Sequence, residues 1–110
     1  MAPTNYSRGR ALEYRTRDQA LRDGAVAVVR AAGSKGKIDL VILWPALESY
    51  MVWPNPGDVW LVQCKRDGKL PADEREALLD IASRTGHAVY TAEPGPGNRG
   101  VVFTPIITEE

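Results

Sequence analysis

The chain has 110 residues, of which 44% are hydrophobic, and this length fits one compact domain while leaving no room for a second. Cys64 is the only cysteine and His87 the only histidine, which excludes an internal disulfide framework and argues against a zinc-ligand cluster. The formal net charge is zero, so total charge alone gives no sign of a nucleic acid or membrane partner.

The first half of the chain predicts one helix and three strands. Ser7 is suited to cap a helix over residues 8–22 that ends at Gly24, and its apolar stripe is thin, being limited to Ala11, Tyr14 and Leu21. Segments rich in Val and Ile predict strands over residues 25–30 and 37–43, joined by a turn at 33–36. A third strand, 59–65, follows a proline-rich segment, 45–57, that we expect to form an ordered surface loop.

The second half predicts a helix followed by two short strands. Pro71 is suited to the first helical position and Gly86 to the end of this helix. Its expected buried face consists of Leu78, Ile81, Ala82 and Thr85. Strands at 88–91 and 101–103, separated by a Gly- and Pro-rich loop at 94–100, complete an α/β chain of order αβββαββ.

The charges are divided unevenly along the chain. Residues 1–69 carry eleven of the 14 Lys and Arg with seven of the 14 Asp and Glu, a net charge of +4, and residues 70–110 carry a net charge of −4. Such a chain can present a basic face to phosphates, although a solvated charge pattern without a partner is an equal alternative. No segment approaches the roughly 20 apolar residues that span a bilayer, so we expect a soluble, cytoplasmic protein in a reducing compartment.

Polar residues within apolar strands indicate a site. Asp39 lies in one strand and Gln63 and Lys65 at the end of the next, where alternation places these last two on one face and Cys64 on the other. If the strands pair as a hairpin, Asp39 meets that face. Oxygen donors from a carboxylate, an amide and a backbone carbonyl suit Mg²⁺. Taken alone, the pattern is weak and is better explained by an ordinary ion pair between Asp39 and Lys65.

Asp39, Gln63 and Lys65 belong to a longer pattern of four sequence blocks. The blocks are RGRALE at 8–13, VVRAAGSKG at 28–36, IDLV at 38–41 and VQCK at 62–65. In order and spacing they resemble the motifs of the archaeal-type Holliday junction resolvases, which have a PD-(D/E)XK nuclease core. The resemblance runs from about Ser7 to Phe103. It implies a restriction-endonuclease-like α/β fold with a mixed central sheet flanked by helices, in αβββαβ order.

The same resemblance implies roles for individual residues. Asp39 and Gln63 would flank a Mg²⁺ ion with the Cys64 backbone carbonyl as a further ligand, and Lys65 would orient or polarise the attacking water. Glu13 would hold a water or a second ion. The implied activity is the cutting of four-way DNA junctions by a homodimer, in recombination or repair.

Basic residues supply the candidate contacts with DNA. By resemblance, Arg30 and Ser34 lie near the scissile phosphate, and Lys35 belongs to a segment that approaches DNA. Further basic residues that could follow phosphates on two duplex arms are Arg8, Arg10, Arg15, Arg17, Arg22, Lys37, Arg66 and Lys69. Simpler alternatives are a Glu13–Arg17 pair at i,i+4 spacing and a solvated Arg30.

Gln63 departs from the wider nuclease superfamily, where many members have Glu. The amide removes one negative charge from the site, so we expect loose Mg²⁺ binding and better activity with Mn²⁺. Two rival functions follow: a related nuclease acting on flaps, mismatches or specific duplex sites, and a catalytically weak DNA-binding module. His87 has no neighbouring nucleophile in the sequence, and we interpret it as structural or exposed.

The aromatic residues near the proline-rich segment have two interpretations. Trp44, Tyr50, Met51 and Trp53 could form the apolar interface of a homodimer, or they could cover the core of the domain itself. The sequence favours neither.

Overall fold

The computed structural model describes residues 5–31, 36–46 and 57–107. Its elements are α1 Asn5–Arg22, β1 Ala27–Arg30, β2 Leu40–Leu43, β3 Val59–Cys64, α2 Ala72–Thr85, β4 Ala88–Pro94, the 3₁₀ turn η1 Pro96–Asn98, and β5 Val101–Pro105. The predicted order of helices and strands is confirmed. No helix in these ranges is long and apolar enough to cross a membrane.

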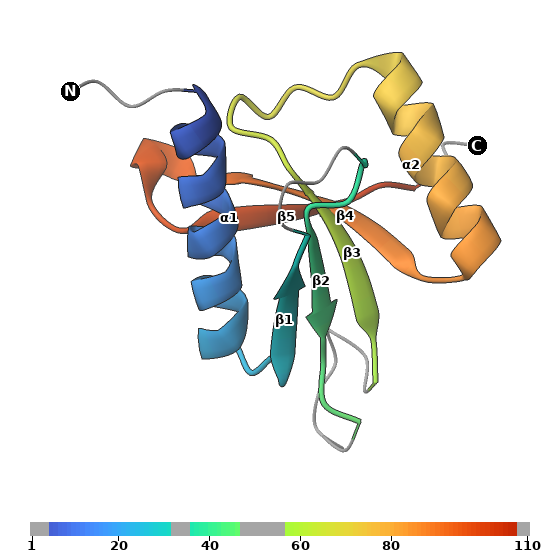
Figure 1. Ribbon diagram of the computed structural model, residues 1–110, viewed down its shortest axis with the longest axis horizontal. Helices are drawn as coiled ribbons and strands as arrows, with labels where there is room; N and C mark the ends of the chain where they lie inside the picture. The colour runs from blue at the N-terminus through green and yellow to red at the C-terminus, as the bar shows by residue number, and fades with distance from the viewer. Residues whose placement is uncertain (1–4, 32–35, 47–56, 108–110) are drawn as a thin grey trace.

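The five strands form one mixed sheet in the order β1-β2-β3-β4-β5 (Figure 1). Antiparallel pairing joins β1 to β2, β2 to β3 and β4 to β5. The β3–β4 pair is parallel, and a parallel pair needs a crossover connection, which α2 supplies. Because β2 and β3 are antiparallel, β3 ends and leads into α2 at the same end of the sheet where β2 begins (Figure 1).

The helices cover opposite faces of the sheet. On the α1 side the core includes Leu12, Ile42, Val62 and Tyr90, and on the α2 side it consists of Leu78, Val89 and Ile106. Neighbouring residues such as Val89 and Tyr90 enter different cores because side chains alternate along a strand. The sheet is therefore the middle layer of a three-layer arrangement.

Aromatic rings fill the core on the α1 side. Trp60 is 1% exposed, stacks on Tyr90 with ring centroids 4.0 Å apart, and meets Trp44 and Phe103 edge to face. Trp44 is itself buried, so it belongs to the core of the domain rather than to an exposed interface. The other candidates for an interface, Tyr50, Met51 and Trp53, lie outside the described residues.

The apolar stripe predicted for α1 was wrong. Tyr14 and Leu21 are 39% and 43% exposed and Ala11 is also exposed, whereas Leu12, Thr16 and Ala20 are buried. The buried side is hard to recognise because it contains a polar residue. The Thr16 hydroxyl satisfies its hydrogen bond by donating to the Leu12 carbonyl at 2.8 Å, so it can be buried without an unpaired group.

The helix ends were predicted better at the C-termini than at the N-termini. After α1, the Gly24 N–H donates to Leu21 and the Ala25 N–H to Ala20, which is a Schellman motif with Gly24 at positive φ. Gly86 ends α2 in the left-handed conformation. However, α1 begins at Asn5 rather than after Ser7.

Further details of α2 and β2 differ from expectation. Pro71 is the N-cap of α2 rather than its first helical residue, and Thr85 is exposed at the end of that helix. The strand expected from residue 37 starts only at Leu40, so Asp39 lies just before β2. Its backbone still pairs, because the Asp39 N–H donates to the Val62 carbonyl at 2.8 Å. Asp39 and Leu40 thus both lie opposite Val62, as at a β-bulge.

Candidate active site

Asp39 and Gln63 lie at the same end of the sheet. The register pairs Leu40 with Val62, and Asp39 directly precedes Leu40 while Gln63 directly follows Val62. The Asp39 Oδ2 atom accepts a hydrogen bond of 2.8 Å from the Cys64 N–H. The backbone of β3 thus fixes the orientation of this carboxylate.

The Asp39 carboxylate is held in an environment that opposes its charge. Burial raises its pKa above the ordinary value, although the Cys64 N–H and the positive charges of Lys65 and Arg30 act in the opposite direction. A cation placed beside this group would favour the ionised form. The carboxylate is therefore suited to bind one.

Replacing Asp39 by Asn is expected to stabilise the metal-free protein at neutral pH. Because the pKa of Asp39 lies above its unfolded-state value, the folded state binds more protons between the two values, and stability falls as the pH rises through that window. The variant keeps an oxygen that can accept the Cys64 hydrogen bond. We expect its Tm in EDTA to be a few degrees higher at neutral pH, since about 1 kcal/mol shifts the Tm of such a domain by about 4 °C.

The comparison should be made across acidic and neutral pH. The difference in Tm should disappear at a pH low enough to protonate Asp39 in both the folded and unfolded states. A Tm of the variant equal to or below that of the wild type at pH 7 would contradict this account of the carboxylate.

Gln63 has an unsatisfied oxygen. Its Oε1 atom is buried and accepts no hydrogen bond within the described part of the chain. Leaving such an acceptor unpaired costs about 1–3 kcal/mol, so a partner is expected where the protein works. An amide oxygen beside a carboxylate is a donor set that a hard divalent cation accepts, and Asp39 and Gln63 therefore fit Mg²⁺ or Mn²⁺.

Glu13 reaches the site from α1. Its Oε1 atom accepts from the Arg30 Nε at 2.9 Å, and both side chains are largely buried. Burial raises the pKa of Glu13 and the nearby Asp39 charge raises it further, against the lowering effects of Arg30 and Arg10. A carboxylate whose charge is disfavoured by a second carboxylate nearby is a further indication of a place for a cation.

The simpler interpretations of Glu13 and Arg30 were wrong. Arg17 pairs with Asp18 at 2.9 Å rather than with Glu13. Arg30 is not solvated, because it forms the ion pair with Glu13 and lies over the Tyr14 ring at 5.0 Å. Its guanidinium is thus held in place beside the carboxylates.

Lys65 forms an ion pair that the sequence pattern did not predict. Its Nζ contacts the Glu74 carboxylate from α2, and the two side chains are 18% and 27% exposed. The ordinary Asp39–Lys65 pair considered from the sequence is not formed, although the Lys65 charge lowers the pKa of Asp39. Glu74 lies in the first turn of α2. The position of Glu74 in the chain could have indicated this pair. The helix α2 begins only a few residues after Lys65, so its first turn can lie close to the end of β3.

The Cys64 thiol takes no part in the cluster of charged groups. It lies on the α1 side, 3.9 Å from the Thr16 hydroxyl, and burial raises its pKa to about 12. A thiol that stays protonated is neither a nucleophile nor a ligand at neutral pH. The contribution of this residue to a metal site therefore remains the predicted one, through its backbone carbonyl.

The residues expected to contact DNA are only partly described. Arg10 and Arg66 are exposed near the site, on α1 and directly after Lys65. Arg8 lies in α1, but its side chain is outside the described part, as are Ser34 and Lys35 entirely. In the described part no group of three or more His, Cys, Asp or Glu side chains forms a metal cluster. Glu13 and Asp39 lie close enough for their charges to interact, and Gln63 precedes Cys64, whose N–H donates to Asp39.

A comparison with solved structures identifies the fold. Hjc from Archaeoglobus fulgidus, a Holliday junction resolvase from an archaeal hyperthermophile, matches this chain with a TM-score of 0.63 and 25% sequence identity. The match covers 94% of this chain and 80% of that one. No protein-family model and no curated protein matches the sequence. The resemblance seen in the sequence motifs is therefore confirmed by structure, and the chain has the PD-(D/E)XK fold of an archaeal Hjc-like resolvase.

Proposed function

We propose that this protein is a metal-dependent endonuclease that cuts four-way DNA junctions. The observation that supports the proposal is the buried Gln63 oxygen, which has no partner among the described residues and lies in the strand whose Cys64 N–H holds the Asp39 carboxylate. The charge of Asp39 acts on Glu13, and that of Lys65 acts on Asp39. The likeness to an archaeal resolvase supports DNA as the substrate. The role in recombination or repair and the cytoplasmic location are part of the same proposal.

The residues divide the work of phosphodiester hydrolysis. Asp39 and Gln63 would hold Mg²⁺, or Mn²⁺ in its place, with the Cys64 carbonyl as a further ligand. The bound cation supplies Lewis acidity, which activates water and offsets negative charge on the phosphate. Lys65 places a positive charge where charge develops on the attacked phosphate and orients the water whose oxygen forms the new P–O bond. One P–O ester bond then breaks, and its oxygen leaves with a proton.

Glu74 acts in this proposal as a positioning residue for Lys65. Their ion pair ties the end of β3 to the first turn of α2, so it limits the positions of a long and flexible side chain. We expect Glu74→Gln to lower the cleavage rate constant by about 10- to 100-fold, the effect typical of a group that orients a catalytic residue. Junction affinity should not fall.

The measurement is single-turnover cleavage together with binding of the junction in EDTA. Glu76→Gln is the matched control because Glu76 is exposed on the same helix. Glu74→Asp should recover part of the rate, which a merely structural loss would not explain. If Glu74→Gln cuts at the wild-type rate, Lys65 does not need this partner.

A synthetic four-way junction, a flap and a linear duplex, each with and without Mg²⁺, test the proposed substrate. Cutting of the junction alone supports resolution, whereas cutting of the flap or of one duplex sequence supports a related nuclease. The second candidate function is a catalytically weak DNA-binding module. The observation that favours it is that position 63 has an amide, Gln63, rather than a second carboxylate beside that of Asp39 in the strands. Binding without cleavage under either metal would establish that alternative.

Paired cuts on opposite strands require two active sites. A homodimer with two-fold symmetry places identical sites in this way, so we propose that the protein acts as a dimer. Light scattering at working concentration, alone and with the junction, measures this directly. A monomer on the cut junction would contradict it.

A further inference from the structure

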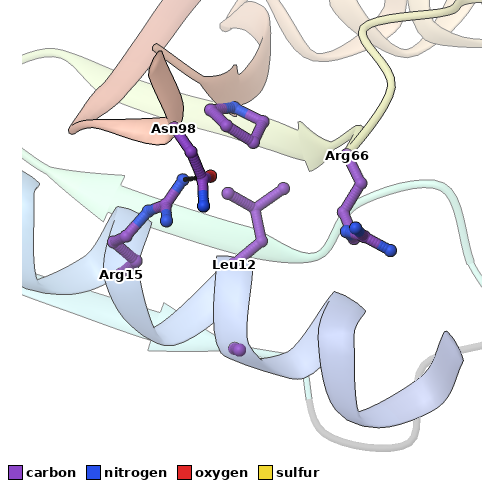
Figure 2. A pocket seen from close by; sticks show the side chains of 6 residues that line it. Leu12, Arg15, Arg66 and Asn98 are labelled. Carbon is purple, nitrogen blue, oxygen red and sulfur yellow. Dashed lines mark hydrogen bonds between the residues drawn. The ribbon is translucent and has the colours of Figure 1, made fainter. Parts of the chain in front are cut away.

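A second polar site lies beside the candidate active site, in a pocket of about 270 Å³ between α1 and the segment where β4 meets η1 (Figure 2). The residues that line it are Ala11, Leu12, Arg15, Arg66, Pro94 and Asn98. Arg66 directly follows Lys65 in the chain, so the pocket borders the proposed site of cleavage. None of the catalytic residues lines it.

Arg15 enters the pocket without a carboxylate partner among residues 5–31, 36–46 and 57–107. Its Nη2 atom donates to the Asn98 Oδ1 at 3.2 Å, which leaves the positive charge uncompensated because an amide is neutral. Its Nε atom is buried and has no hydrogen-bond partner within the described residues. A buried N–H of a charged group is costly without an acceptor, so this geometry calls for an anion.

The turn that contains Asn98 positions its side chain for this contact. Gly97 and Asn98 both have positive φ, 67° and 61°, and Asn is one of the few residues with a side chain that tolerates this region. The turn brings the Asn98 amide to Arg15 from a distant part of the chain, as the hydrogen bond in Figure 2 shows. The guanidinium is therefore held in place while its charge stays available.

Arg66 supplies a second charge to the same pocket. It is exposed and has no hydrogen-bond or ion-pair partner in the part of the chain that the structure describes. Figure 2 shows Arg15 and Arg66 on either side of Leu12. By contrast, Arg17 and Arg84 are paired with Asp18 and Asp80. The pocket thus holds two guanidinium groups that have no carboxylate partner among the described residues.

We propose that this pocket binds a phosphate group of the DNA backbone other than the scissile one. Arg15 and Arg66 would donate charge-assisted hydrogen bonds to its oxygens, and Leu12 and Pro94 would contact the adjoining sugar. The inference rests on the proposed function for its choice of DNA, since the pocket itself specifies only a phosphate-like anion. It gives Arg15 and Arg66 one shared phosphate, assigns Asn98 the role of positioning Arg15, and fixes a second point of the strand next to the proposed cleavage site.

Binding of a four-way junction in EDTA tests the proposal with Arg66→Gln as the main variant, because an exposed side chain can be replaced without loss of the fold. We expect about tenfold weaker binding and a salt dependence reduced by about 0.9 in the slope of log K against log salt, as for one lost phosphate contact. Arg84→Gln, which removes an equal charge from α2, should change neither quantity appreciably.

Single methylphosphonate substitutions then locate the phosphate. Neutralising one particular phosphate near the cut should weaken wild-type binding but have little further effect on Arg66→Gln, because the two changes remove the same contact. If every substitution weakens both proteins equally, the pocket does not bind a backbone phosphate. The proposed cleavage activity would be untouched by that result.

Nuclear magnetic resonance distinguishes DNA from a free anion as the source of the phosphate. The signals of the Arg15 Nε–H and the Asn98 side-chain amide should shift with a short oligonucleotide in the wild type and not in Arg66→Gln. Shifts with inorganic phosphate but not with the oligonucleotide would overturn the assignment to DNA. Shifts with DNA in a protein that cuts no junction under any metal would support the pocket while refuting the nuclease function.

Discussion

Asp39→Asn is expected to abolish junction cleavage while leaving junction binding in EDTA intact. The substitution removes the negative charge that, in the proposed site, holds the cation beside Gln63. The cation supplies several kcal/mol of charge stabilisation, so the single-turnover rate should fall by at least about 1,000-fold. Binding depends on phosphate contacts made by basic side chains and should change less than about twofold.

Asp80→Asn is the matched control, because Asp80 is an exposed carboxylate on α2 and its removal should leave the rate unchanged. A thermal shift adds a measurement that does not depend on activity. Mg²⁺ should raise the Tm of the wild type and fail to raise that of Asp39→Asn. Cleavage by the variant at a tenth or more of the wild-type rate would exclude Asp39 as a metal ligand.

Gln63→Glu is expected to tighten metal binding by about tenfold or more. A second carboxylate beside Asp39 adds a negative charge next to the cation, and this interaction amounts to a few kcal/mol at an intermediate dielectric, part of which is lost to burial. The variant should therefore need less Mg²⁺ for half-maximal cleavage. Its preference for Mn²⁺ over Mg²⁺ should become smaller than that of the wild type.

The same substitution should have the opposite effect without metal. Without a cation, the new carboxylate would be buried close to Asp39, whose own charge is already disfavoured by burial. The Tm of the variant in EDTA should therefore be lower than that of the wild type, and its rise on adding Mg²⁺ should be larger. Gln63→Met, which removes the oxygen at similar volume, should lose the metal response. Equal metal requirements in Gln63→Glu and the wild type would show that this position does not bind the ion.

Much of the fold could be predicted because local signals agree with the final structure. Gly24 and Gly86 end their helices as expected, since both positions need a positive φ that glycine adopts at little cost. The starts of the helices were less predictable. Pro71 and Ser7 are compatible with neighbouring positions of a helix N-terminus, and only the surrounding chain decides between them.

The buried side of α1 shows why periodicity alone was insufficient. Thr16 is fully buried because its hydroxyl bonds to the helix backbone, and Ala20 because close packing requires a small side chain. Neither residue type marks a core face. Tyr14, which does look like a core residue, instead lies on the surface between the guanidinium groups of Arg17 and Arg30.

In the candidate site, the residues proposed for catalysis could be named from the sequence, whereas the ion-pair partners that the structure gives them could not. Asp39, Gln63 and Lys65 follow from strand alternation and motif order, which are properties of the local sequence. Glu74 comes from α2, and only the crossover of this helix between the parallel strands brings it to Lys65. Arg30 was expected at the site but not as the partner of Glu13.

The sequence by itself determined the order of the elements and the nuclease-type motifs, and it supplied the residues proposed to bind a cation, because each depends on nearby residues or on a fixed spacing. Only the tertiary structure decided which charges are compensated. Ion pairs such as those of Glu13 and Lys65 join segments distant in the chain, and so does the neutral contact that leaves Arg15 charged in its pocket. Long-range pairing of this kind is set by the packing of α1 and α2 on the sheet, and no local pattern encodes it.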